Sequence, residues 1–123
     1  MMNAEQLHRK AVESRYTGIC NVYEQKAERN EVTKLMEQKE VLVLENQPCR
    51  ISFSSVPSAS EKQNAAKVDQ IVTLFIAPEL EIKAGSKIVI TQDNVTREYS
   101  KSGISAVYPS HQEITLELLG GYA

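Results

Sequence analysis

From Tyr16 onward, apolar and polar residues alternate with a period of two, and this alternation limits most of the chain to β structure. The clearest case is segment 113–119, in which Ile114, Leu116 and Leu118 are separated by Thr and Glu. Successive side chains of a strand point to opposite faces, so this pattern predicts a strand with one buried and one exposed face.

Similar short runs recur along the chain, with turn-forming residues between them. We expect strands at 16–23, 32–45, 49–53, 70–76, 95–99, 103–108 and 113–119, and strand segments on both sides of residues 83–86, where Leu80, Ile82, Ile88 and Ile90 are spaced by two. Residues 34–39 fit a helix as well, so the start of the strand at 32–45 stays open. The turns between them fall at 24–30, 46–48, 83–86 and 93–94, and Gly85 suits a positive φ angle. Seven or eight short strands without a βαβ rhythm predict a mainly β fold, a small antiparallel β-barrel or sandwich over residues 16–119.

One helix is expected before the strands, over residues 4–15. Asn3 can cap it, with Gln6 in the position of a capping-box partner. Its apolar stripe is narrow and holds little more than Leu7 and Val12 between alanines. We therefore expect a helix docked on the surface of the domain, or one that awaits a partner.

Segment 54–67 is rich in Ser and short polar residues, and this composition is typical of a flexible loop. Loops of this length inside compact domains are usually functional or disordered. It is therefore either an inert mobile loop or a segment that orders against a neighbouring subunit. The candidate contact residues are Ser54, Ser55, Val56, Pro57, Ser58, Ala59, Ser60 and Glu61.

The composition indicates a single domain, residues 1–123, made and kept in the cytosol. The net charge of −2 and the lack of a basic stripe argue against a dedicated nucleic-acid binder. No apolar run approaches the about 20 residues that span a bilayer, and the N-terminus does not resemble a secretory signal. Cys20 and Cys49 lack metal-site spacing, so two reduced, buried thiols are expected, with an inter-strand disulfide as the alternative.

Catalytic and cofactor-binding residues are not evident. Ser110 and His111 could form a nucleophile pair, but neighbouring residues of a strand point to opposite faces, so we expect their side chains to diverge. The ring of His111 is expected instead to hold a corner through hydrogen bonds. No glycine-rich phosphate loop or metal cluster is present, and we predict no enzyme, no metal and no cofactor.

Five stretches occur in an order that resembles the head–tail connector, or head-closure, family of long-tailed bacteriophages. They are GICNVY at 18–23, ENQPCRISF at 45–53, LFIAP at 74–78, IKAGSKI at 82–88 and YPSHQEI at 108–114. The chain is most similar to the small minor-capsid-type proteins that prophages of Gram-positive bacteria encode between their capsid and tail genes.

The resemblance implies a small β-barrel with a long loop, which would be segment 54–67. It also implies a virion structural protein, assembled in the host cytoplasm, that forms a ring at the virion neck, closes the DNA-filled head and docks the tail. The implied partners are other copies of the chain, portal or adaptor proteins and tail-terminator proteins, with no membrane and no specific nucleic acid. The alternative is a small cytosolic β-barrel module that binds an oligonucleotide or a peptide.

Overall fold

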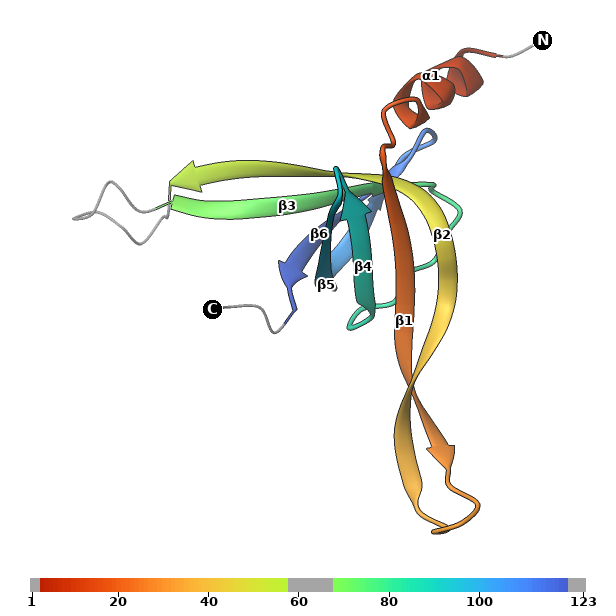
Figure 1. Ribbon diagram of the computed structural model, residues 1–123. Coiled ribbons are helices and arrows are strands. Elements are labelled where there is room, and N and C mark those ends of the chain that lie inside the picture. The colour runs from red at the N-terminus through yellow and green to blue at the C-terminus, as the bar shows by residue number, and fades with distance from the viewer. Residues whose placement is uncertain (1–2, 58–67, 120–123) are drawn as a thin grey trace.

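The period-two segments form six antiparallel strands in the computed structural model, which describes residues 3–57 and 68–119 (Figure 1). The elements are α1 (Ala4–Glu13), β1 (Gly18–Arg29), β2 (Met36–Pro57), β3 (Val68–Ile76), β4 (Lys87–Gln92), β5 (Val95–Val107) and β6 (Gln112–Leu118). The strands close into a barrel in the order β1-β2-β3-β6-β5-β4, and every pairing is antiparallel. The expectation of a mainly β barrel with one short N-terminal helix is therefore confirmed.

Alternate side chains of the strands fill the inside of the barrel. In β6, Ile114 and Leu116 are buried, and Thr115 between them is exposed. Leu118, expected on the same buried face, is 54% exposed because it is the last residue of the strand. Ile88 and Ile90 of β4 follow the same rule. The described core consists of Cys20, Val22, Cys49, Ile51, Leu74, Ile76, Ile82, Ile88, Ile90, Tyr99, Ile114 and Leu116. The period of two thus decides which residues enter the core.

The turn expected at 46–48 is wrong, because β2 runs through it without reversing. Asn46 does adopt a positive φ of 52°, but the pairing with β1 shifts register here, and the backbone N–H of Asn46 donates to Asn21 Oδ1 at 2.8 Å. Pro48 lies within the strand opposite Ile19. A positive φ inside a ladder produces a β-bulge, which bends a strand and increases its twist.

A second bulge explains why the structure has fewer strands than expected. Segments 95–99 and 103–108 are parts of one strand, β5, whose pairing with β6 shifts between Ser102 and Ala106. Gly103 lies in this interval with φ of 76°. In contrast, the turns at 93–94 and 83–86 are confirmed, since Asp93, Asn94 and Gly85 all have positive φ angles between or before paired strands. The strand segment expected at residues 80–82 is wrong, because they belong to the connection between β3 and β4 and have no described strand partner.

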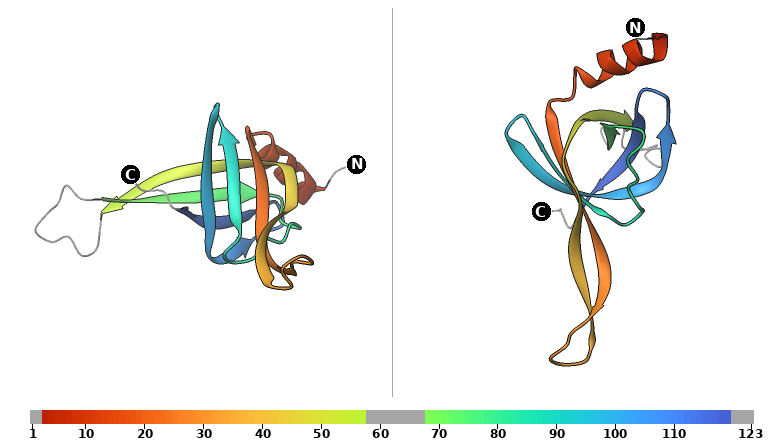
Figure 2. Two further views of the ribbon diagram at one scale, coloured as in Figure 1. Left: turned by 60° about the horizontal axis from the view of Figure 1, so that its bottom comes forward. Right: turned by 90° about the vertical axis from the view of Figure 1, so that its right-hand side faces the viewer.

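Two long hairpins extend from the barrel in different directions (Figures 1 and 2). One joins β1 to β2. The turn expected at 24–30 is wrong because residues 24–29 continue β1, and the strand expected from Val32 begins only at Met36, since residues 31–33 form the turn. The other joins β2 to β3, and here β2 continues to Pro57 where a loop was expected from Ser54. The bulge at Asn46 lies between these two parts of β2, so one strand can serve both hairpins.

Helix α1 forms at the predicted place and ends two residues earlier than expected. The Asn3 side chain accepts from the backbone N–H of Gln6 at 2.8 Å, and the Gln6 side chain accepts from the backbone of Asn3 at 2.9 Å. No residue of α1 is buried. An ion pair from Arg9 to Glu79 at 2.6 Å links the helix to the connection after β3.

Candidate functional site

The predicted contact residues divide into two groups. Ser54, Ser55, Val56 and Pro57 belong to β2 and pair with residues of β3. Ser54 and Ser55 are exposed on this hairpin. Ser58, Ala59, Ser60 and Glu61 lie outside the described residues. The part of the segment that is described is therefore ordered strand, because β2 keeps its ladder with β3 for four residues beyond the apolar run.

A different projection, the β1–β2 hairpin beyond the barrel, is the most exposed ordered part of the described chain. We call residues 24–41 the arm. Its two strands pair without interruption from Glu24↔Val41 to Arg29↔Met36. Six pairs at about 3.3 Å per residue extend the arm by about 20 Å from the barrel.

The end of the arm, residues 30–36, is held by its own hydrogen bonds, and we call it the arm tip. Asn30 Oδ1 accepts from the backbone N–H groups of Val32 and Thr33 at 2.8 and 3.0 Å. The backbone N–H of Asn30 donates to the carbonyl of Leu35 at 2.8 Å. Such side-chain bonds to the backbone stabilise tight turns, so the tip has a defined shape without a partner.

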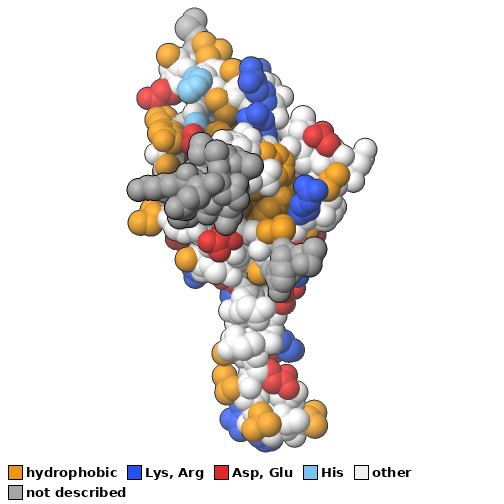
Figure 3. All heavy atoms as spheres, turned by 90° about the vertical axis from the view of Figure 1, so that its left-hand side faces the viewer, with side chains coloured by type: hydrophobic (Ala, Val, Ile, Leu, Met, Phe, Trp, Pro, Cys, Tyr) orange, Lys and Arg blue, Asp and Glu red, His pale blue; other side chains and the backbone are white. Residues whose placement is uncertain are grey.

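The arm tip presents apolar side chains to solvent. Val32 is 90% exposed, Leu35 65% and Met36 66%. Figure 3 shows hydrophobic side chains at this end of the molecule beside charged ones. Clustered exposed apolar residues on an ordered support are typical of a protein-interaction surface. Their exposure was not predicted from the sequence, although three apolar residues in an otherwise polar stretch were a visible signal.

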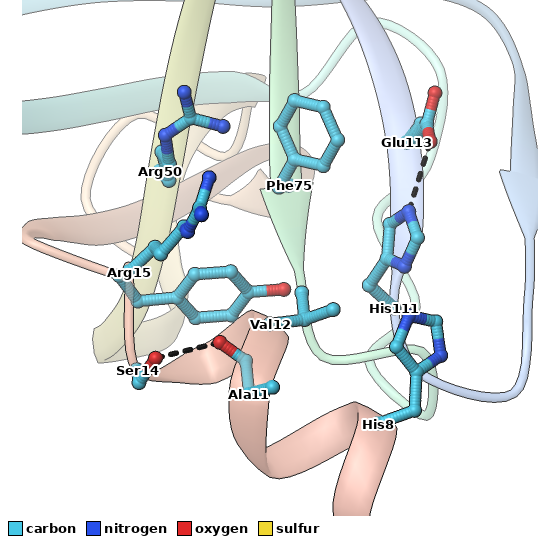
Figure 4. Close-up of a pocket in the computed structure, with 10 residues that line it drawn as sticks. His8, Ala11, Val12, Ser14, Arg15, Arg50, Phe75, His111 and Glu113 are labelled. Atoms are coloured by element: carbon cyan, nitrogen blue, oxygen red, sulfur yellow. Dashed lines mark hydrogen bonds and ion pairs between the residues drawn. The ribbon is translucent and has the colours of Figure 1, made fainter. Parts of the chain in front are cut away.

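A pocket of about 530 Å³ lies between α1 and the barrel, and we call it the helix pocket (Figure 4). It is lined by His8, Ala11, Val12, Ser14, Arg15, Tyr16, Arg50, Phe75, His111 and Glu113. The lining side chains come from α1, from the segment that follows it, and from β2, β3 and the start of β6. The pocket exists because α1 stands away from the barrel and buries none of its own residues.

The helix pocket carries two arginines that lack acidic partners among residues 3–57 and 68–119. Arg15 and Arg50 lie near each other in Figure 4, and neither forms an ion pair or donates a side-chain hydrogen bond to a described residue. The Arg50 guanidinium lies 5.6 Å from the centroid of Phe75, a cation–π distance. Two such guanidiniums in one pocket favour an anionic group such as a carboxylate or a phosphate.

Tyr16 adds a buried hydroxyl to the same pocket. Its oxygen is shielded from solvent, and no described atom is its hydrogen-bond partner. Burial, with a contribution from the charge of Glu13, raises the pKa of Tyr16 to about 12. The hydroxyl is therefore neutral at ordinary pH.

His111 holds the corner before β6 through hydrogen bonds, as expected. Its Nδ1 lies 2.8 Å from Ser110 Oγ and its Nε2 lies 2.8 Å from Glu113 Oε2. The expectation that Ser110 and His111 diverge is wrong, because Ser110 lies in the bend before β6, where strand alternation does not apply. The ring also stacks on Tyr108, with centroids 5.0 Å apart.

A serine, a histidine and a glutamate in this order are the residue types of a hydrolase triad. Ser110 is only 2% exposed, however, and it is absent from the lining of the helix pocket. A nucleophile must reach the substrate carbon, and a buried hydroxyl has no such access. The arrangement instead satisfies three polar groups at a corner, as buried polar groups require.

A second hollow lies at the side of the barrel where Phe53, Arg97 and Leu118 meet. Tyr99 lines it and is 1% exposed, and its hydroxyl has no described partner. This hollow offers fewer groups for binding a charged ligand than the helix pocket, since Arg97 is its one charged lining residue among those described.

Residues 3–57 and 68–119 show no metal site and no membrane-spanning helix. No group of three or more His, Cys, Asp or Glu side chains in these residues could hold a metal ion. The one described helix is too short and too polar to cross a bilayer. Cys20 and Cys49 are free and fully buried, as expected. Hydrogen bonding to Cys49 and burial raise the pKa of the Cys20 thiol far above its usual value.

Comparison with known proteins gives one solved structure with the same architecture. No protein-family model matches the chain, and no curated protein sequence matches it. A solved structure, the phage-like element PBSX protein XkdH from Bacillus subtilis, is similar over 83% of this chain and 93% of that chain, with a TM-score of 0.51 and 11% sequence identity. The chain shares the fold of a phage-like element protein. At this level of identity the similarity concerns the fold.

Proposed function

We propose that the chain is a structural protein of a long-tailed phage or prophage, which forms a ring at the head–tail junction, closes the DNA-filled head and docks the tail. It would be assembled in the host cytoplasm and act at the virion neck. The observation that carries the proposal is the fold shared with a phage-like element protein over nearly the whole of both chains. The resemblance of five ordered sequence stretches to connector proteins supports the same function.

The surface of the molecule fits a subunit that works through contacts with other proteins. Two hairpins project from a small barrel, and one of them ends in exposed apolar side chains. Homo-oligomeric rings arise when one surface of a subunit meets a different surface of the next copy. The proposed partners are therefore other copies of the chain, with portal or adaptor proteins on one side of the ring and tail-terminator proteins on the other.

The experiment that tests this function is electron microscopy of an induced lysate from a host whose prophage lacks the gene. We expect separate tails, and heads that are empty or unjoined. Complementation with the intact gene should restore joined particles. Normal tailed particles in the deletion lysate would contradict the proposal.

We propose further that the chain is not an enzyme. Ser110, His111 and Glu113 are the residues that a hydrolase would use, but Ser110 is buried. A corner that depends on these hydrogen bonds should become less stable on His111→Ala. Hydrolysis of simple esters that disappears in both Ser110→Ala and His111→Ala would contradict this part of the proposal.

One observation favours the alternative of an oligonucleotide-binding module. Arg15, Arg50, Phe75, His111 and Tyr108 bring basic and aromatic groups to one end of the barrel, and such groups bind single-stranded nucleic acid. However, His111 lies between the other two rings, at 5.0 and 5.5 Å, so much of the aromatic surface is already in contact with itself. Fluorescence anisotropy with a labelled single-stranded oligonucleotide would detect this activity, and we expect no binding at physiological salt.

A further inference from the structure

The arm tip and the helix pocket lie at opposite ends of the molecule (Figure 1) and have complementary properties. The arm tip is ordered and apolar and projects about 20 Å from the barrel. The helix pocket is an open cavity of about 530 Å³ with apolar walls and two arginines without described acidic partners. In Figures 1 and 2 the arm and α1 extend from different sides of the barrel, so the tip of a given copy does not reach its own pocket.

We propose that the arm tip of one copy docks in the helix pocket of the next copy. This inference rests on the proposed ring and deepens it by naming the contact that joins its subunits. Val32 and Leu35 would lie against Val12 and Phe75, and Glu31 would lie near Arg15 and Arg50. The occupant is a second copy of this chain, recognised by an apolar end that carries an acidic group.

The chemistry of the tip supports this occupant. Glu31 precedes Val32, and its side chain is 82% exposed, with one distant ion pair to Lys34 at 3.7 Å. A carboxylate in that state can exchange a weak surface pair for two guanidiniums in a partly enclosed pocket, where charge-assisted bonds are stronger.

The pocket suits a protein segment in size and character. Its volume is within the about 300–1,000 Å³ typical of sites that enclose a small group. Its walls include Ala11, Val12 and Phe75, so apolar side chains of the tip would leave water on docking. Because the tip keeps its shape through Asn30, docking requires little ordering of the chain.

The placement of the two surfaces also fits a ring. A contact between two different surfaces is heterologous, and repeated copies of it close into a ring or continue as a filament. The contact of one tip is small beside the about 20–30 residues a side of a stable interface. Each contact alone is therefore weak, and ring closure, in which every subunit is held on two sides, makes the assembly stable.

Cross-linking between copies tests the docking directly. One protein carries Val32→Cys in the tip and a second carries Val12→Cys in the pocket wall, and the mixture is treated with a short bismaleimide. The native thiols are fully buried, so the added thiols are the reactive ones. We expect a covalent dimer in the mixture and at least about tenfold less in either protein alone. Val95→Cys, which is exposed on the β4–β5 turn, is the matched control and should not cross-link to Val12→Cys.

Exchanging the charges of the tip and the pocket distinguishes specific docking from cross-linking by random encounter. Arg15→Glu with Arg50→Glu in the Val12→Cys protein should abolish the cross-link, and Glu31→Lys in the tip should restore it. Circular dichroism checks that each variant is folded. No cross-link between Val32→Cys and Val12→Cys, or one that is indifferent to both charge changes, would overturn the inference. So would a single-stranded oligonucleotide that binds the pocket through Arg15 and Arg50 while the tip does not.

This result can be distinguished from that of the proposed function. If the deletion lysate shows unjoined heads and tails but no cross-link forms, the neck function stands and the docking is wrong. If the cross-link forms but particles without the gene are normal, the docking stands and the neck function is wrong.

Discussion

Single residues with positive φ angles determine where the strands of this barrel bend. Asn46 and Gly103 both lie inside strands whose pairing shifts register at that point. Asp93, Asn94 and Gly85 have the same backbone geometry but lie between strands. The same residue types therefore produce a bulge or a turn, and the choice depends on whether neighbouring strands continue the ladder on both sides.

Gly103 gives a prediction at this scale. Its φ is 76°, and a Cβ placed on it would have no described atom within 4 Å, so strain of the backbone is the main cost of a side chain there. Gly103→Ala should lower the free energy of unfolding by about 1–2 kcal/mol in urea denaturation. Gly103→Asn is the matched control and should cost less, because Asn tolerates this conformation better. Equal stability of Gly103→Ala and the parent protein would contradict the account.

Tyr16 gives a pH-dependent prediction. Its pKa is raised from 10.0 in the unfolded chain to about 12 in the folded protein, mainly by burial. The folded state therefore retains the proton longer, and the stability this contributes is complete below pH 10 and is lost as the pH rises from 10 to 12. Urea denaturation should show a smaller loss over this range for Tyr16→Phe than for the parent protein. Identical pH profiles would show that the hydroxyl is not buried.

At the scale of elements, the arm contributes little to the free energy of unfolding of the barrel. Residues 24–29 pair with residues 36–41. The barrel contacts the arm at its base, where Lys87 Nζ lies 3.3 Å from Glu40 Oε1. An isolated two-stranded hairpin is only marginally stable in water, so the arm adds little to the fold. The ordered, exposed tip of the arm is suited to binding another protein rather than to stabilising the fold.

Shortening the arm tests this small contribution to stability. Replacement of residues 27–38 by Asn-Gly would join Lys26 to Lys39, which are paired in the parent protein, through a two-residue hairpin turn. The midpoint of thermal unfolding should change by no more than about 4 °C, which corresponds to about 1 kcal/mol for a domain of this size. A loss of cooperative unfolding would show that the arm belongs to the folding unit.

The sequence predicted some of these elements correctly and missed others, and the reasons are physical. Strand β6 and the turn at Asp93 and Asn94 were predicted correctly, since period-two alternation and turn chemistry act over a few residues. The first strand of the arm was missed because residues 24–30 are almost all polar, and a solvent-exposed hairpin has no buried face to leave an apolar alternation. The helix pocket was also missed, because its lining residues lie far apart in the chain.

At the scale of the whole molecule, we expect the arm to act in assembly of the ring and not in the isolated protein. A single apolar tip is too small for a stable dimer, so the isolated protein should be a monomer at micromolar concentration by light scattering. In a prophage that lacks the gene, the protein with the shortened arm should fail to restore joined particles, while Val95→Cys should restore them. Joined particles at the parent level with the shortened arm would contradict a role for the arm in the ring.

The sequence alone determined that this protein is a small β domain with a capped N-terminal helix, and it predicted most of the alternate residues that form its core, such as Ile114 and Leu116. These properties follow from local periodicity and capping, which operate within a few residues. Only the tertiary structure decided that the six strands close into a barrel and that two bulges carry long strands through expected breaks. Likewise, only the closed barrel brings α1, Arg50 and His111 around one pocket and places the arm away from it, since long-range pairing sets these distances and directions.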